Sequence, residues 1–326
     1  MLSIFRTNQL VFSLLIIPYL ILIRISSFTD PIIGSVEGAG LFSKFIYQIA
    51  PLNSYVSHIA ALVLIFIQSL IINMACSRYK IFDEPNQLGG LFYALLSSLI
   101  PDFLWLSPVL MANTFLLIAM IELFEIYDKK SGASTIFNIG FFIGLASLFY
   151  ISALVLLIFV LIGLSIQRSF SLKEILMVVI GVIVPYYLLL TYYYWSDNLG
   201  YFYSMQIESG IKLFQFSMPQ DFSSLFKVVL VLIMILIFIF NFNNLSLKRN
   251  IQVTKIQQLL YWWLLIMPLG LMVQAKVQLD FLLILMLPCS ILLTYIFLGM
   301  KKQWADALHI IIVTFVVVFQ YIKYLL

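Results

Sequence analysis

The sequence predicts an all-α membrane protein, a polytopic bundle of transmembrane helices that crosses the bilayer about eleven times. Two observations lead to this prediction. First, 63% of the 326 residues are hydrophobic and only 10% are charged, with a mean hydropathy of +1.09. Soluble domains are about half apolar and about a quarter charged, so a water-soluble fold is excluded. Second, apolar stretches of about 18 or more residues recur along the chain, and such a stretch is long enough to cross a membrane.

The apolar runs between charged residues give the expected spans in order. The segments 88–100 and 136–148 are short, and each fits a tilted helix, a half-inserted helix or one arm of a tight hairpin. We find no internal repeat and no separate soluble domain, so residues 1–326 are expected to form one integral membrane domain. The spans are 9–25, 56–75, 88–100, 107–124, 136–148, 150–166, 175–195, 224–241, 257–273, 281–299 and 304–321.

The 18 basic residues test this threading, because lysine and arginine gather in cytoplasmic connections. When the connections are numbered alternately, twelve basic residues share the side of the N-terminus and six lie opposite, which accounts for all 18. The N-terminus is therefore expected in the cytoplasm, and an odd number of spans places the C-terminus outside. The outer group is Arg24, Lys44, Lys212, Lys227, Lys276 and Lys323.

The first long outward connection carries two acidic residues that could do chemistry. Asp30 stands in the turn signature Thr-Asp-Pro, and Glu37 lies in the glycine-rich stretch "SVEGAG". Either carboxylate could bind a divalent cation or take a proton from an acceptor at the membrane surface. The structural alternative is that Asp30 caps a turn and Glu37 is merely solvated. An amphipathic helix lying in the interface is expected at about 41–50.

Two further segments face the same side. Asp102 stands after a proline in "IPDFLWLSP", where it either caps a helix or meets Asp30. The segment "QAKVQLD" places Lys276 and Asp280 four residues apart, so that they share a face if the segment is helical. They form either a surface ion pair or a phosphate site, in which Asp280 holds the ammonium group of Lys276 in place.

Other classes of site find little support in the sequence. His58 and His309 are isolated, and Cys76 and Cys289 show no metal-binding or disulfide spacing, so no metal site is predicted. No cofactor is indicated. The net charge of +4 comes without a long run of lysine or arginine, which argues against nucleic acid as a partner. The partners expected from composition are membrane lipids.

Three stretches carry a resemblance to a known superfamily. The segment "GGLFYALLSSLIP", followed by "FFIGLASLFY" and later by "AKVQLDFLLILMLP", resembles the multi-pass GT-C glycosyltransferases, which use polyprenyl-phosphate-linked sugars. In them a short helical pair ending in proline precedes a longer span and a "G…GLA" helix. Two features depart from that pattern: only Asp30 and Glu37 are available in the first outward loop, and the late Arg-Tyr is replaced by the segment from Lys276 to Asp280.

The resemblance implies an outward-facing cavity for a lipid-linked sugar. Asp30 would act as base, with Glu37 and Asp102 as further catalytic candidates, while Lys276 and Asp280 would meet the departing phosphate. The spacing of the whole chain is also similar to that of a family of inner-membrane proteins from Bacteroidota without a known activity, so we expect a bacterial inner-membrane location. The alternative is a non-enzymatic membrane subunit or scaffold of an envelope or translocation complex, which would bind other membrane subunits.

Overall fold

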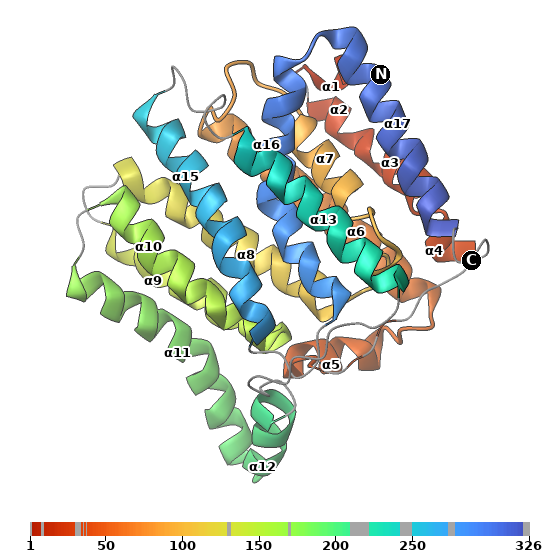
Figure 1. The fold of residues 1–326 in the computed structure, drawn as a ribbon. Helices are drawn as coiled ribbons and strands as arrows, with labels where there is room; N and C mark the ends of the chain where they lie inside the picture. Colours follow the sequence, from red (N-terminus) through yellow and green to blue (C-terminus); the bar gives the residue numbers. More distant parts are fainter. Residues whose placement is uncertain are drawn as a thin grey trace.

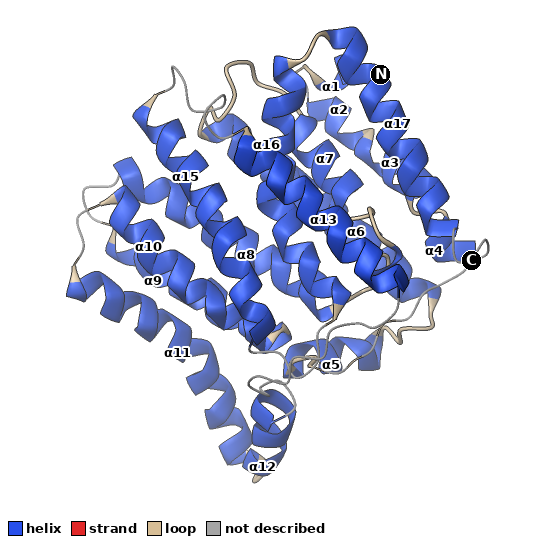
Figure 2. Ribbon diagram, in the orientation of Figure 1, coloured by secondary structure: helices blue, strands red, loops and turns tan. Residues whose placement is uncertain are grey.

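The described part of the chain is built from helices and loops (Figures 1 and 2). In the computed structural model this part comprises residues 2–7, 10–29, 34, 36, 38–128, 132–168, 171–208, 222–241, 250–272 and 278–321. Six helical segments within it are long and apolar enough to cross a membrane. The protein is therefore an all-α, multi-pass membrane protein. The six are α6 (Tyr55–Arg78), α8 (Pro108–Glu125), α11 (Leu172–Trp195), most of α13 (Phe222–Phe240), Leu279–Gly299 and α17 (Lys302–Tyr321).

Shorter elements complete the bundle. Three further apolar helical segments, Val11–Ile23, Ala133–Phe149 and Ile151–Gln167, are shorter than 18 residues. The nine-residue α7 is only about 14 Å long, so the expected span 88–100 crosses only together with the loop after it. The count of about eleven crossings stays a prediction. The remaining bounds are α1 (Leu2–Phe5), α2 (Leu10–Leu14), α3 (Ile16–Ile23), α4 (Ser26–Thr29), α5 (Leu41–Ile49), α7 (Leu88–Leu96), η1 (Pro101–Phe103), η2 (Ile126–Asp128), α9 (Ala133–Phe149), η3 (Ile151–Val155), α10 (Leu156–Gln167), α12 (Leu199–Phe202), η4 (Tyr203–Glu208), α15 (Ile251–Ile266), η5 (Met267–Met272), η6 (Leu279–Leu285) and α16 (Met286–Gly299).

The first and last helices of the bundle run side by side in the same direction (Figure 1). The backbone N–H of Leu2 donates to Asp306 at 2.8 Å, near the start of α17. Further along, the Tyr19 hydroxyl lies 2.9 Å from Nε2 of His309, and Ser26 donates to Gln320 at 2.5 Å. Parallel first and last spans are what an odd number of crossings requires.

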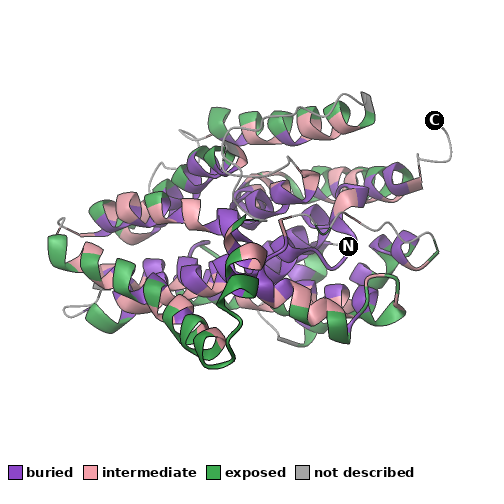
Figure 3. Cartoon of the chain, turned by 90° about the horizontal axis from the view of Figure 1, so that it is seen from below, coloured by how far each residue is buried: buried purple, intermediate pink, exposed green. Residues whose placement is uncertain are grey.

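The bundle has a central core and a peripheral set of helices (Figure 3). Every residue of α7 is buried, and so is most of α8 and α16. In contrast, only 22% of an 18-residue apolar stretch of α11 is buried, and only 11% of the corresponding stretch of α13. An apolar helix that is exposed along its length suits a hydrocarbon environment, so these two helices face lipid or a partner protein.

Small residues bring α9 and α11 into close contact. A Cβ atom at Gly140 would overlap the carbonyl oxygen of Val178, and one at Gly181 would overlap that of Phe137. Gly144 lies one turn further along the same face of α9, against Val182. Backbones that approach this closely gain dispersion contacts in a membrane, where burial of apolar surface drives little association.

Arg24 is buried at the end of α3. The sequence had placed it among the basic residues of the outward connections, so this expectation was wrong. Its guanidinium donates to the carbonyls of Ser97 at 2.8 Å and Phe103 at 2.7 Å, and more weakly to that of Leu104 at 3.3 Å. Its Nε donates to the Ser98 hydroxyl at 3.0 Å. These carbonyls belong to the non-helical connection between α7 and α8 and would otherwise lack donors, because backbone inside a membrane protein has no water to bind.

Replacing Gly140 with valine should separate α9 from α11. The added side chain meets a backbone carbonyl, which cannot move aside as a flexible side chain would, so we expect a loss of about 1–3 kcal/mol. In detergent, the thermal unfolding midpoint should fall by roughly 3–8 °C. The matched control is Gly200→Ala, because no atom lies within 4 Å of a Cβ placed there. Equal midpoints for both variants would contradict the close contact.

Replacing Arg24 with methionine should destabilise the protein by about 2–4 kcal/mol, because several buried acceptors lose their donor together. In detergent, the thermal unfolding midpoint should fall by roughly 5–10 °C. Arg168→Met serves as the control, since Arg168 is partly exposed and only 3.5 Å from Glu174, an arrangement that contributes under about 1 kcal/mol. If the two variants unfold at the same temperature, Arg24 does not hold the connection.

Candidate functional site

The structure brings together two of the five predicted site residues. Asp102 and Asp280 lie at the same end of the bundle, where the 3-10 helices η1 and η6 pack against each other. Asp30, Glu37 and Lys276 fall outside the described residues, so their predicted roles stay untested. We therefore build the site from Asp102 and Asp280 and from the side chains around them.

Asp102 is held by a local motif of the chain. Pro101 begins η1 after the extended residue Ile100, and Asp102 follows it in the first turn. Its Oδ2 accepts from the ammonium group of Lys227 at 2.7 Å, and both side chains are mostly buried. Lys227 belongs to α13, so this ion pair joins the central η1 to a peripheral helix. Ser107, not Asp102, caps the following helix α8. The contact between Asp102 and Asp30 stays a prediction, because Asp30 lies outside the described residues.

Asp280 has an unusual environment for a carboxylate. It stands in the first turn of η6 and is only 3% exposed. No side chain in the described part of the chain donates a hydrogen bond to either of its oxygens, and the backbone N–H groups of Asp280 and Phe281 lie near them. Asp102 is close enough to interact with it electrostatically. A buried carboxylate normally has donors around it, since leaving it without them is costly, so this one calls for a functional explanation.

Two phenols lie beside Asp280. The Tyr47 hydroxyl on α5 donates to the carbonyl of Leu106 at 2.9 Å. Burial, with a smaller contribution from the charge of Asp280, raises the pKa of the Tyr47 phenol above its ordinary value of 10. Tyr150, which is buried between α9 and η3, also interacts with Asp280 electrostatically. Its ring lies 6.3 Å from that of Phe281, measured between centroids.

The first outward connection is attached to this end of the bundle. The N–H of Gly40 donates to the carbonyl of Phe149 at 2.8 Å, and an isolated bridge joins Ala39 to Tyr150. Gly34 lies against the indole of Trp105, three residues after Asp102. The amphipathic helix expected at 41–50 is confirmed as α5, which lies across this end of the bundle (Figure 1).

The cluster can perform acid–base chemistry next to a cation. An unpaired carboxylate can accept a proton or a hydrogen bond from a hydroxyl, and a lysine ammonium can meet an anionic oxygen. Among the described residues, no three or more histidine, cysteine, aspartate or glutamate side chains group as a metal site would require. The groups available for chemistry are therefore two carboxylates, one lysine ammonium group and two phenols.

Sequence reasoning missed Lys227 as a site residue. It was counted only as one of the outer basic residues, although it stands alone in the apolar run "FKVVLVLIMILIFIF". A lone ionisable residue within a span is a signal for a functional or paired group, and this signal could have identified it. Tyr47 and Tyr150 carried no such signal, because aromatic residues are abundant throughout the chain.

Comparison with known proteins places the chain in a family. No match was found among curated proteins or among solved structures. Residues 35–325, which include the outward connection from Gly40 onward, Asp102, Lys227 and Asp280, match a family described as "Family of unknown function (DUF6427)". Since this match covers most of the 326 residues, the chain belongs to the DUF6427 family, and it is a member with a multi-pass helical membrane fold.

Proposed function

We propose that the protein is a GT-C-like glycosyltransferase that moves a sugar from a polyprenyl-phosphate carrier to a hydroxyl acceptor. The observation that carries this proposal is Asp280, a buried carboxylate to which no described side chain donates a hydrogen bond, beside the Asp102–Lys227 ion pair. A catalytic base must be free to meet its substrate, whereas a structural carboxylate has its donors in place.

In the proposed reaction Asp280 takes the proton from the acceptor hydroxyl. The acceptor oxygen then forms a bond to the anomeric carbon of the sugar, and the bond from that carbon to the phosphate oxygen breaks. The electron pair leaves with the polyprenyl phosphate. This assigns Asp280 the role of base, in place of the phosphate-site role that the spacing to Lys276 had predicted for it.

Lys227 is the proposed partner of the departing phosphate. Its ammonium group is held by Asp102 at 2.7 Å, and Asp102 interacts electrostatically with Asp280. A partly buried cation stabilises developing negative charge more strongly than an exposed one, because water screens it less. Asp102 then acts as a positioning residue for Lys227. Asp30, Glu37 and Lys276 remain candidates for further contacts with the acceptor and the phosphate.

The proposed location is a bacterial inner membrane, with this site facing outward. Its support is the distribution of basic residues: among the described residues, three belong to the side of this site, namely Arg24, Lys44 and Lys227, and eight belong to the other side, namely Arg6, Arg78, Lys80, Arg168, Lys173, Lys255, Lys301 and Lys302. The end with more basic residues is the cytoplasmic one by the positive-inside rule.

A non-enzymatic subunit of an envelope complex is the second candidate. It is favoured by one observation, the exposure of α11 and α13 along most of their apolar length, which would suit contact with another membrane subunit. Purification in a mild detergent distinguishes the two functions. Stable co-purifying subunits and no turnover of lipid-linked sugar would favour the subunit.

Replacing Asp280 with asparagine should abolish sugar transfer while leaving the fold intact, because the amide keeps the shape but cannot take the proton. In vesicles of the native lipid extract, mass spectrometry should show the release of polyprenyl monophosphate falling by at least about 100-fold. Asp197→Asn is the control, since Asp197 is an exposed acid in a turn on the same side. Full activity in Asp280→Asn would exclude the proposed base.

Replacing Lys227 with methionine should weaken the binding of polyprenyl monophosphate about tenfold, because one charge-assisted contact is lost. Asp102→Asn should have the opposite effect and strengthen binding, since it removes a negative charge and releases Lys227. The measurement is a titration of each purified variant with the lipid phosphate in detergent. A loss of affinity of the same size in both variants would indicate general damage to the site and contradict the assigned roles.

A further inference from the structure

We propose that a groove along α6, at the end of the bundle opposite Asp280, binds one membrane phospholipid whose headgroup carries an ammonium group. The groove has a volume of about 610 Å³. Its walls come chiefly from α6, with contributions from Ser13 on α2 and Ile121 on α8. This site is independent of the proposed transferase reaction, since it shares no residue with the cluster around Asp280.

One part of the groove suits a hydrocarbon chain. Leu70, Ile71 and Met74 line it, and Met74 is 64% exposed on a helix that is apolar enough to span a membrane. On the adjoining α2, Val11 is 68% exposed and Leu14 is 55% exposed. These apolar surfaces face the bilayer, so a lipid chain covers them without removing any polar group from water.

The floor of the groove offers an unused hydrogen-bond donor. Asn73 lines it and is only 3% exposed. Its Oδ1 accepts from the backbone N–H of Gly90 at 2.6 Å, which fixes the orientation of the amide. The Nδ2 group has no partner in the described part of the chain. A buried donor of this kind matches an ester or phosphate oxygen, whereas a cation would be repelled by it.

The polar end of the groove supplies a cation for a phosphate. Ser77 and Arg78 stand at the last turn of α6 and both line the groove. Arg78 is paired with Glu125 at 3.0 Å through Nη2, and its side chain is still 61% exposed. A guanidinium has five N–H donors, so this ion pair leaves donors for a phosphate oxygen. Lipid phosphates also lie at the ends of membrane spans, where they contact lysine and arginine side chains.

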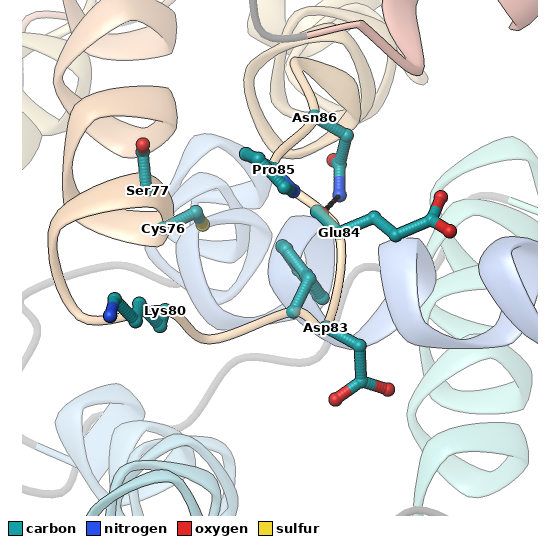
Figure 4. A pocket seen from close by; sticks show the side chains of 8 residues that line it. Cys76, Ser77, Lys80, Asp83, Glu84, Pro85 and Asn86 are labelled. Atoms are coloured by element: carbon teal, nitrogen blue, oxygen red, sulfur yellow. Dashed lines mark hydrogen bonds between the residues drawn. The ribbon is translucent and has the colours of Figure 1, made fainter.

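A second hollow continues from Ser77 and explains the preference for an ammonium group. It has a volume of about 400 Å³ and lies between the end of α6 and the loop before α7 (Figure 4). Figure 4 shows the exposed carboxylates of Asp83 and Glu84 extending from that loop on the side away from α6, with Lys80 on the side of α6. The two exposed carboxylates give the rim of this hollow a negative charge that attracts a cation. A phosphoethanolamine headgroup, with its phosphate at Arg78 and its ammonium at the acids, fits this charge pattern better than an anionic headgroup.

Native mass spectrometry of the full-length protein with equal amounts of phosphatidylethanolamine and phosphatidylglycerol tests the proposal. We expect one retained phosphatidylethanolamine. Met74→Trp fills the groove and should reduce the bound fraction about tenfold, whereas Ile183→Trp, at a lipid-facing position of α11 that is 53% exposed, should not. Equal retention by Met74→Trp and the wild type would overturn the groove as the site.

The headgroup is tested by charge variants at the rim of the groove, where Arg78, Asp83 and Glu84 are exposed and Glu125 is partly exposed. Arg78→Gln should weaken retention about tenfold, whereas Glu125→Gln, which breaks the same ion pair but keeps the cation, should not. The double variant Asp83→Asn/Glu84→Gln should shift the preference toward phosphatidylglycerol. A wild-type preference for phosphatidylglycerol, or no shift in the double variant, would overturn the assignment. Equally tight binding of soluble glycerophosphoethanolamine would also overturn it, because the ligand would then be a free phosphate ester instead of a lipid.

Discussion

The contact between Arg24 and the connection after α7 is the constraint on which the proposed site depends. Backbone that leaves helical geometry inside a membrane protein must find partners within the protein. The carbonyls of Ser97, Phe103 and Leu104 find them in one guanidinium group. Because η1 lies within this connection, the position of Asp102 is set by a residue of the first span. A buried arginine here serves other parts of the chain instead of pairing with an acid.

The fold followed from patterns that the sequence carries plainly. Long apolar runs between charged residues gave the helical membrane class, and the six long helices lie on expected spans. The sequence could not show that Arg24 is buried, because a basic residue at the end of a span is read as a loop charge. Burial of an arginine depends on acceptors that are 73 to 80 residues away along the chain, and no local pattern reports such contacts.

The sequence predicted which end of the bundle holds the candidate site, but it did not predict which charged residues pair there. Alternation of the connections put Asp102, Lys227 and Asp280 on one side, and the structure puts all three at one end of the bundle. Spacing along the chain suggested that Asp280 pairs with Lys276, since residues four apart meet on a helix. Lys276 lies outside the described residues, so that pairing stays a prediction. Asp280 opens the 3-10 helix η6, and the described cation that pairs with the nearby Asp102 comes from α13. Pairing across a bundle is decided by packing, which sequence spacing does not record.

The position of α13 bears on how a substrate would reach the site. Lys227 belongs to α13, the most exposed of the six long helices. Only 11% of the 18-residue apolar stretch of α13 is buried. Val231 and Phe238 are its buried apolar residues, and the Tyr261 hydroxyl binds the Phe238 carbonyl at 3.1 Å. The cation of the site therefore stands at the boundary with the bilayer, while Asp280 stands inside the protein. A substrate with its phosphate on a lipid and its sugar pointing inward would meet both groups without leaving the membrane, whereas a fully water-soluble donor would gain nothing from a cation placed there.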